Sequence, residues 1–234
     1  MRDTQREIVT FDAYGTLIDF QLGPTTLKIL ADSGRLDLDN LDVDEFLDDF
    51  RVMRFQAVLE AYRPYHEILH SSLRNAMRLH GLEYRESDGD ALVEAVPTFG
   101  PFPEVPEALR QLKTKYEIAI ISNSDDNLIA RNVENIGVEF DHVITAQQAG
   151  AYKPDRQTFE HAFKAMGVEP SQVIHTAQGW EYDQIATRDL GLKRRVWINR
   201  YGRPGSADYQ PYDELPDLSG LPKLLGCRPT ATQD

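Results

Sequence analysis

Hydrophobic and polar positions along this chain follow two patterns, one typical of buried strands and one typical of amphipathic helices. Short apolar runs that suit strands occur at residues 7–12, 116–121, 143–144, 171–175 and 194–198. Between the later runs, residues 155–166 and 182–190 have the length and apolar spacing of helices. Because short apolar strands that alternate with helices are typical of a parallel sheet covered on both faces, the pattern predicts a Rossmann-like, doubly wound α/β core.

A long segment of helical character separates the first predicted strand from the second. Residues 45–62 and 65–79 carry apolar side chains at helical spacing, and Pro64 lies between them as a helix breaker. A proline-rich segment, residues 97–106, then leads the chain back to the sheet. The expected division is therefore a Rossmann-like core at 1–19 plus 97–227, an inserted helical domain at 20–96 and a C-terminal tail at 228–234.

The charge balance argues against several classes of partner. The chain has 38 Asp and Glu against 25 Lys and Arg, a formal net charge of −13, whereas nucleic-acid binding needs concentrated positive charge. No apolar run approaches the ~18–20 residues that cross a bilayer, and the first residues contain no apolar block of a signal peptide. The single cysteine, Cys227, excludes an internal disulfide. We therefore expect a cytoplasmic protein with no nucleic-acid partner and no membrane partner.

Residues with reactive or polar side chains follow four of the predicted strands. In open α/β sheets, ligands bind outside the carboxyl ends of the strands. Asp12, Ser122 with Asn123, Lys153, and the segment His175–Asp183 all stand at such ends. An aspartate after a strand can simply cap the following turn, but a carboxylate at this place costs desolvation unless donors surround it. Because reactive or polar residues follow four strands, we expect them to form one site.

Four sequence motifs occur in an order that identifies a family resemblance. The string Phe11–Leu17 (FDAYGTL) resembles the nucleophile motif of the haloacid dehalogenase superfamily. Ile120–Asn123, Tyr152–Asp155, and His175–Asp183 with Leu190–Leu192 resemble the second, third and fourth motifs. The resemblance covers residues 7–202 and places the helical insert where this family carries its cap. It implies a hydrolase in which Asp12 is a covalent nucleophile.

Two positions indicate which branch of the superfamily the chain resembles. Phosphatases of this superfamily carry a second aspartate that protonates the leaving alcohol, and this chain has Tyr14 there. They also use acids of the fourth motif to hold Mg²⁺, and Gln178 stands at the first of these, which leaves Asp183 as the matching carboxylate. Halide needs no protonated donor to leave. The string therefore resembles the (S)-2-haloacid dehalogenases of type II, which implies no metal and no cofactor.

The resemblance implies a two-step reaction on the Asp12 side chain. Asp12 attacks C2 of a small (S)-2-haloalkanoic acid, expels halide and forms an ester, and water then releases the 2-hydroxy acid. The expected catalytic residues are Asp12, Thr16, Arg51, Lys153 and Asp183, with Arg54 as the alternative to Arg51. The expected substrate-binding residues are Tyr14, Ser122, Asn123, Gln178 and Trp180.

Charge explains several of these assignments. The substrate is a small anion and the protein is strongly negative, so positive potential has to be concentrated at the site. Lys153 is expected to lower the pKa of Asp12 and to attract the substrate carboxylate. Thr16 is expected to donate to Asp12, and Arg51 to lie near the leaving halide. An apolar wall around the carbon–halogen bond is expected from Tyr14, Tyr65 and Trp180.

Three positions depart from the type II pattern. Those enzymes carry Ser-x-Asn where this chain has Gln178 and Trp180, and a tyrosine where it has Phe159. These differences leave open how the hydrolytic water is held, whether by Gln178 or by Asp183, which acts either as its base or as a partner to Lys153. His175, at the end of a strand, is interpreted as a core residue or as a residue behind the site.

Two other functions stay open from the sequence. One is an atypical Mg²⁺-dependent phosphatase of the same superfamily, against which Tyr14 speaks. The other is a non-catalytic binding protein of the same fold, against which the intact set of Asp12, Ser122 and Lys153 speaks. The natural substrate, the preferred halogen and a homodimer, which such relatives often form, are not decided by the sequence.

Overall fold

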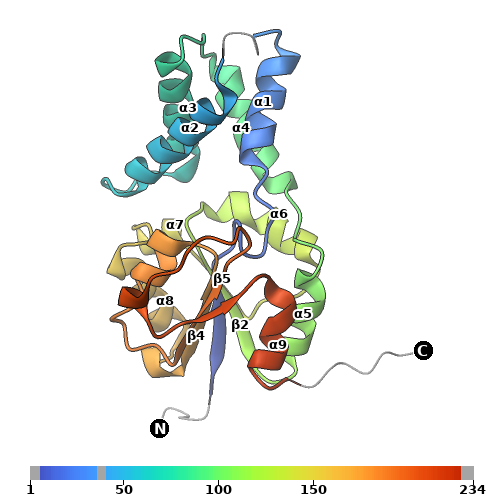
Figure 1. Cartoon of the computed structure of the whole chain (residues 1–234), viewed down its shortest axis with the longest axis vertical. Helices are drawn as coiled ribbons and strands as arrows, with labels where there is room; N and C mark the ends of the chain where they lie inside the picture. The colour runs from blue at the N-terminus through green and yellow to red at the C-terminus, as the bar shows by residue number, and fades with distance from the viewer. Residues whose placement is uncertain (1–5, 36–40, 228–234) are drawn as a thin grey trace, which may run out of the picture.

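A six-stranded sheet in which every strand pair is parallel forms the centre of the computed structural model, which describes residues 6–35 and 41–227 (Figure 1). The spatial order of the strands is β3-β2-β1-β4-β5-β6. The strands are β1 (Ile8–Phe11), β2 (Glu117–Ser122), β3 (His142–Thr145), β4 (Val173–Ala177), β5 (Arg194–Ile198) and β6 (Asp213–Leu215). The predicted doubly wound α/β core is confirmed. The predicted tail at 228–234 lies outside the described residues.

Strand β1 lies at the middle of the sheet, between β2 and β4. All four of its residues are buried, as expected for a parallel strand with both faces covered. Its last residue, Phe11, pairs with Ile120 of β2 and Thr176 of β4. The residues that follow these three strands therefore meet at one edge of the sheet.

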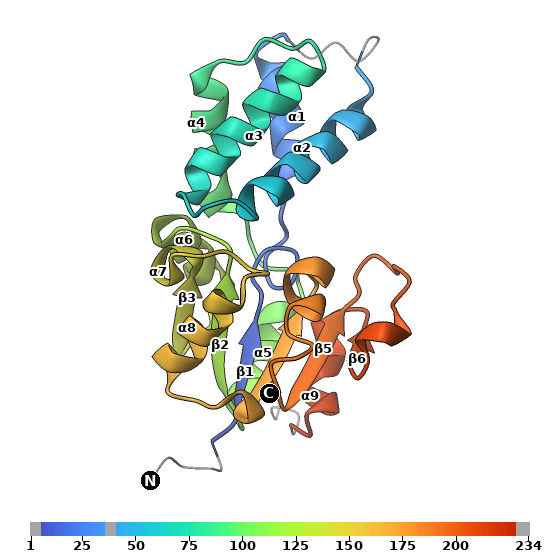
Figure 2. The same ribbon diagram turned by 90° about the vertical axis from the view of Figure 1, so that its left-hand side faces the viewer.

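Helices cover the two faces of the sheet (Figure 2). They are α5 (Val105–Lys113), α6 (Asp126–Ile136), α7 (Ala146–Ala149), α8 (Arg156–Met166) and α9 (Leu221–Leu224). Alternate residues of β2 point to opposite faces. Ile118 and Ile120 pack in one apolar cluster with residues of α5 and α9, whereas Ala119 and Ile121 pack in another with residues of α8.

Four helices between β1 and β2 form a separate helical unit beyond the carboxyl ends of the strands (Figure 1). They are α1 (Leu22–Asp32), α2 (Val43–Val58), α3 (Tyr65–Leu79) and α4 (Glu86–Ala95). Helix α3 has the bounds that the apolar spacing predicts, since Ile68, Leu69, Leu73, Ala76 and Met77 form its buried face. The division into domains at 19/20 and 96/97 stays a prediction.

One local prediction is wrong, and one strand was not predicted. The segment 182–190 is not a regular α-helix: a wide π-helical turn spans Trp180–Ile185 and is followed by turns. In this turn the N–H of Gln184 donates to the carbonyl of Gly179, and Asp183 is fully buried. The short strand β6 was not predicted, because its residues are partly exposed and give no apolar run. No helix among the described residues is long and apolar enough to span a membrane.

Candidate active site

Asp12 follows the central strand, and two donors hold its carboxylate. The Thr16 hydroxyl donates to Oδ2 at 2.8 Å, and Lys153 Nζ donates to Oδ1 at 2.9 Å. Gly15, between Asp12 and Thr16 in the sequence, has a φ of 86°, a left-handed conformation that glycine adopts without strain. That conformation accompanies a tight turn in which Leu17 N–H donates to the carbonyl of Ala13. The turn brings Thr16 back over the Asp12 carboxylate.

Lys153 is shared by two carboxylates. Its side chain is 1% exposed, and Nζ lies 2.8 Å from Asp183 Oδ1 as well as 2.9 Å from Asp12 Oδ1. The same Asp183 oxygen also lies 2.9 Å from Nε2 of His175. The four side chains of Asp12, Lys153, Asp183 and His175 thus form one hydrogen-bonded chain, three members of which are fully buried. The structure brings together four of the five predicted catalytic residues, namely Asp12, Thr16, Lys153 and Asp183.

Burial and charge act on the two carboxylates in different proportions. Burial raises the pKa of Asp12, and the nearby Asp183 carboxylate raises it further. Lys153 and the Thr16 hydroxyl lower the Asp12 pKa, but only part of the way back. The expected effect of Lys153 on Asp12 is therefore present and outweighed by burial. At Asp183, burial is overcome by Lys153 and His175, which hold the Asp183 pKa below its usual value.

The ion pairs with Asp12 and Asp183 keep Lys153 protonated. Burial alone would lower the pKa of this ammonium group, but the carboxylates of Asp12 and Asp183 raise it above the usual lysine value. Lys153 is therefore an ammonium ion at neutral pH. It occupies the position between the two carboxylates, where a cation is needed to offset their repulsion.

Ser122 and Asn123, at the end of β2, have different surroundings. The Ser122 hydroxyl is buried and has no hydrogen-bond partner among the described residues. The side-chain amide of Asn123 instead donates to the Lys153 carbonyl at 2.8 Å and accepts from the Lys153 N–H at 2.7 Å. Asn123 therefore fixes the backbone of Lys153.

Tyr14 lies beside the nucleophile but its hydroxyl points elsewhere. The hydroxyl donates to Asn132 Oδ1 at 2.9 Å, and the ring lies 4.6 Å from the ring of Phe20. Burial raises the pKa of the Tyr14 phenol far above its usual value. Tyr14 is thus a neutral aromatic residue two positions after Asp12. Tyr65 is also buried.

The two arginines of α2 occupy different faces of that helix. Arg51 is about as exposed as its ion-pair partner Asp48, with 60% of its side chain accessible, and lies 2.8 Å from it. The structure does not bring Arg51 into the cluster around Asp12. Arg54 packs instead over the rings of Phe20 and Phe50, at 5.8 and 4.8 Å, and its Nε is buried without a hydrogen-bond partner among the described residues.

Gln178 and Trp180 follow β4 and face different ways. The Gln178 N–H donates to Thr16 Oγ1 at 2.8 Å, so the loop after β4 helps to position Thr16. The Trp180 ring packs against Trp197 at 4.7 Å and Tyr212 at 5.5 Å. Trp180 therefore belongs to an aromatic cluster that joins two loops at this edge of the sheet.

One residue next to the site was missed by the sequence analysis. Arg200 follows β5, and its Nη2 donates to the backbone carbonyl of Thr16 at 2.7 Å and to Glu104 Oε1 at 2.6 Å. Its guanidinium lies 3.7 Å from the centre of the Phe102 ring. The rule that ligand sites lie at the carboxyl ends of parallel strands points to residues just after β5 and could have found it.

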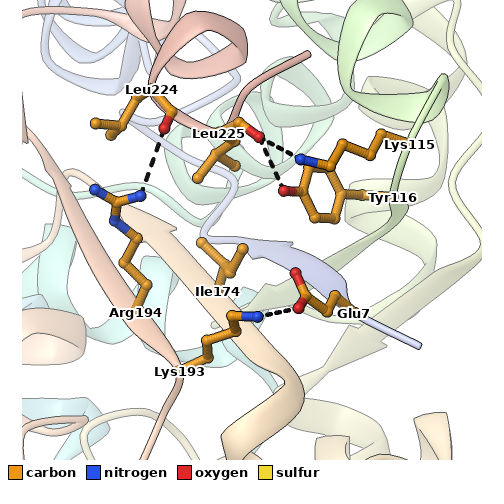
Figure 3. A pocket seen from close by; sticks show the side chains of 8 residues that line it. All are labelled: Glu7, Lys115, Tyr116, Ile174, Lys193, Arg194, Leu224 and Leu225. Carbon is orange, nitrogen blue, oxygen red and sulfur yellow. Dashed lines mark hydrogen bonds and ion pairs between the residues drawn. The ribbon is translucent and has the colours of Figure 1, made fainter. Parts of the chain in front are cut away.

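A hollow of about 680 Å³ lies at the opposite end of the sheet (Figure 3). Its polar groups bind one another: the Lys115 ammonium and the Tyr116 hydroxyl both donate to the Leu225 carbonyl, at 2.8 and 3.0 Å. Lys193 forms an ion pair with Glu7. These contacts fasten the end of α9 to the sheet. The reactive side chains described above lie at the other end of the strands.

Among the residues that the structure describes, no three His, Cys, Asp or Glu side chains converge as a set of metal ligands. Asp12 and Asp183, the carboxylates of the first and fourth motifs, both bind the Lys153 ammonium.

Comparison with known proteins connects this geometry to a family. A family model described as haloacid dehalogenase-like hydrolase matches residues 7–176. The (S)-2-haloacid dehalogenase 4A of Burkholderia cepacia is 27% identical to this chain over 229 residues, which cover 96% of each protein. The haloacetate dehalogenase H-2 of a Moraxella species is 28% identical over 199 residues, which cover 84% of this chain and 87% of the relative. The Xanthobacter autotrophicus L-2-haloacid dehalogenase with chloropropionic acid covalently bound has the same fold, with a TM-score of 0.78 at 20% identity over 94% of this chain and 98% of the other.

Proposed function

This chain belongs to the haloacid dehalogenase-like hydrolases, and we propose that it hydrolyses small (S)-2-haloalkanoic acids to 2-hydroxy acids through an ester on Asp12. One observation carries the proposal: the Asp12 carboxylate is held by Lys153 and Thr16, and the side chain two residues later is the neutral Tyr14. Such a site supplies a nucleophile and a cation but no acid for a poor leaving group. Relatives named as (S)-2-haloacid and haloacetate dehalogenases support the substrate class.

In the first step, an Asp12 oxygen attacks C2 of the substrate from the side opposite the halogen. The carbon–oxygen bond forms as the carbon–halogen bond breaks, and halide leaves with the bonding electrons. The raised pKa of Asp12 makes its ionised form a stronger base, and Thr16 and Lys153 hold it in one orientation. Lys153 also offsets the repulsion between this carboxylate and an anionic substrate.

In the second step, water attacks the carbonyl carbon of the Asp12 ester. Asp183 is the base in this proposal, because its lowered pKa keeps it ionised and its Oδ2 is buried with no hydrogen-bond partner among the described residues. Asp183 accepts one proton from the attacking water and passes it to the substrate oxygen as the bond from that oxygen to the Asp12 carbonyl carbon breaks, so the 2-hydroxy acid leaves as an alcohol. The second proton of the water is released to solvent. Asp12 is then a carboxylate again.

Substrate binding is assigned to groups that are free to receive an anion. The unpartnered hydroxyl of Ser122 can donate to the substrate carboxylate. Arg54, rather than Arg51, is the arginine assigned to the halide, because its guanidinium is half-buried over the rings of Phe20 and Phe50 and its Nε has no hydrogen-bond partner among the described residues, whereas Arg51 is exposed and paired with Asp48. In this proposal the four helices α1 to α4 act as the cap, and the cytoplasmic location and a homodimer stay predictions.

Substrate tests separate this proposal from a phosphatase or a binding protein. The protein is incubated with each enantiomer of 2-chloropropionate and, separately, with p-nitrophenyl phosphate, each with and without EDTA. Chloride release from the S enantiomer that EDTA does not prevent is the expected result. Phosphate release that requires Mg²⁺, or no turnover of either substrate, would contradict the proposal. A single turnover in ¹⁸O-labelled water should place the label in Asp12 before it appears in free product, if the ester forms.

A further inference from the structure

His175 lies in the interior of the sheet behind the proposed base. It is the third residue of β4 and pairs with Thr10 of β1, and its side chain is 1% exposed. Its two ring nitrogens each have one polar neighbour: Thr10 Oγ1 lies 2.8 Å from Nδ1, and Asp183 Oδ1 lies 2.9 Å from Nε2. The ring of Phe159 packs edge-on against it at 5.6 Å. The histidine is thus held on three sides.

These neighbours fix which nitrogen carries the proton. An ionised carboxylate only accepts hydrogen bonds, so Nε2 of His175 has to donate to Asp183. A threonine hydroxyl can donate to an unprotonated Nδ1 or accept from a protonated one, so Thr10 suits both charge states of the ring. The Nε2–H bond to Asp183 therefore persists whether or not His175 is charged.

The hydrogen bonds on Asp183 are divided unequally between its two oxygens. Oδ1 accepts from both Lys153 Nζ and His175 Nε2, at 2.8 and 2.9 Å. Oδ2 has no hydrogen-bond partner among the described residues. It lies so close to Gly179 that a Cβ at that position would be 2.4 Å away. With one oxygen bound twice and the other unbound, the carboxylate has a single preferred orientation.

We propose that His175 is a positioning residue for the hydrolysis of the ester: it holds Asp183 by Oδ1 so that Oδ2 accepts the proton of the attacking water. This inference rests on the proposed function. Without His175, Lys153 alone would hold Asp183, and that ammonium group is also shared with Asp12. The carboxylate could then rotate, and its two oxygens would exchange roles. Halide displacement does not use Asp183 as a base, so it should be spared.

The test separates the two steps by rapid mixing with (S)-2-chloropropionate. In His175→Leu, chloride should appear in the first turnover at a rate within about threefold of the wild type, while hydroxy acid release slows by about tenfold or more. The ester on Asp12 should therefore accumulate and be detected by mass spectrometry of the quenched protein. His175→Gln, whose amide N–H can replace the Nε2–H donor, should restore much of the hydrolysis rate. Thr10→Val is a milder change that removes the hydroxyl next to Nδ1 of His175, and it should accumulate less Asp12 ester than His175→Leu does.

Phe159→Leu is the matched control, because it alters the packing of the His175 ring without removing a hydrogen bond from Asp183. It should not accumulate ester. The inference is wrong, while the proposed function stands, if both steps slow equally in His175→Leu and Thr10→Val. The same holds if these two variants accumulate no more ester than the wild type. If the wild type releases no chloride, the proposed function itself is wrong, and the role of His175 falls with it.

Discussion

The side-chain amide of Asn123 and the backbone of Lys153 exchange two hydrogen bonds, at 2.7 and 2.8 Å. The loop after β2 thereby fixes the loop that carries the lysine, and the lysine in turn binds Asp12 and Asp183. The position of the ammonium group thus depends on a residue that does not contact it. Asn123 was expected to bind the substrate, but its side-chain amide binds the backbone of Lys153 instead.

We predict that Asn123→Ala lowers the rate of chloride release more than it raises KM. The change leaves the N–H and carbonyl of Lys153 without their partners, which should cost roughly 1–3 kcal/mol of unfolding free energy. We expect about a tenfold loss in kcat, since the ammonium group is no longer held in one place. Steady-state kinetics and urea unfolding measure both effects. Asn135→Ala, on the exposed side of α6, is the control and should change neither.

The pKa of Asp12 predicts the acid limit of the reaction. Asp12 attacks only as a carboxylate, and its pKa is raised from 3.8 by burial and by Asp183. As pH falls through this raised value, Asp12 gains a proton, so chloride release in a single turnover should decline at a pH above 3.8. In Lys153→Met the ammonium that lowers the Asp12 pKa is lost, so the decline should move to higher pH. A decline centred at or below 3.8 in the wild type would contradict the buried nucleophile.

Sequence patterns located the sheet and most of the site for a simple physical reason. Parallel strands buried on both faces are mostly apolar, so β1 and β2 are easily recognised. Asp12, which follows β1, and Ser122, which ends β2, are brought to one edge by the parallel pairing. The lysine and aspartate of the third and fourth motifs were found by resemblance. Their contacts with Asp12 follow from the same edge of the sheet.

The remaining site residues depend on contacts that the sequence does not encode locally. Arg51 and Arg54 are three residues apart on one helix, and only the packing of that helix decides which of its neighbouring faces meets the core. His175 in an apolar strand has the pattern of a core residue, and its role depends on where Asp183 lies. The segment after Gly179 has helical spacing, but the wide turn there places Asp183 against Lys153.

A third prediction concerns the contact between the helical unit and the sheet. Asp125, between β2 and α6, accepts hydrogen bonds from the N–H groups of Tyr65 and His66 at the start of α3, at 2.8 and 3.1 Å, and from the His66 ring at 2.9 Å. It therefore caps a helix of the other unit. Asp125→Ala should lower the unfolding free energy by roughly 0.5–2 kcal/mol. It should also raise KM for (S)-2-chloropropionate severalfold, because the proposed cap is less well placed over Asp12.

Asp42→Ala is the control for that prediction. Asp42 also caps a helix, accepting from the Glu45 N–H at 3.0 Å, but both residues belong to the helical unit. Its loss should lower stability by a similar amount and leave KM unchanged. Equal effects of the two variants on KM would mean that Asp125 contributes only helix capping. Thermal unfolding and initial rates on the same preparations decide between these results.

The two arginines of α2 provide the sharpest test of the proposed halide site. Arg54→Met should lower kcat/KM for (S)-2-chloropropionate by about 30-fold or more, because the proposed contact with the halide closes between two charges, and truncating one partner of such a desolvated pair costs roughly 2–5 kcal/mol. Methionine keeps the apolar contacts with Phe20 and Phe50, so the loss reports on charge. Arg51→Met removes an exposed ion pair with Asp48, which is worth roughly 0–1 kcal/mol. Its kcat/KM should stay within about twofold of the wild type.

Comparison of the halogens adds a readout that general destabilisation would not give. If the Arg54 guanidinium stabilises the departing anion, its removal should slow chloride release more than bromide release, because bromide is the better leaving group and needs less assistance. Arg51→Met should leave the ratio of the two rates unchanged. A large loss in Arg51→Met with little change in Arg54→Met would show that α2 turns its other face to Asp12 during turnover. The assignment of the halide site to Arg54 would then be wrong, even though the nucleophile, the lysine and the base would keep their proposed roles.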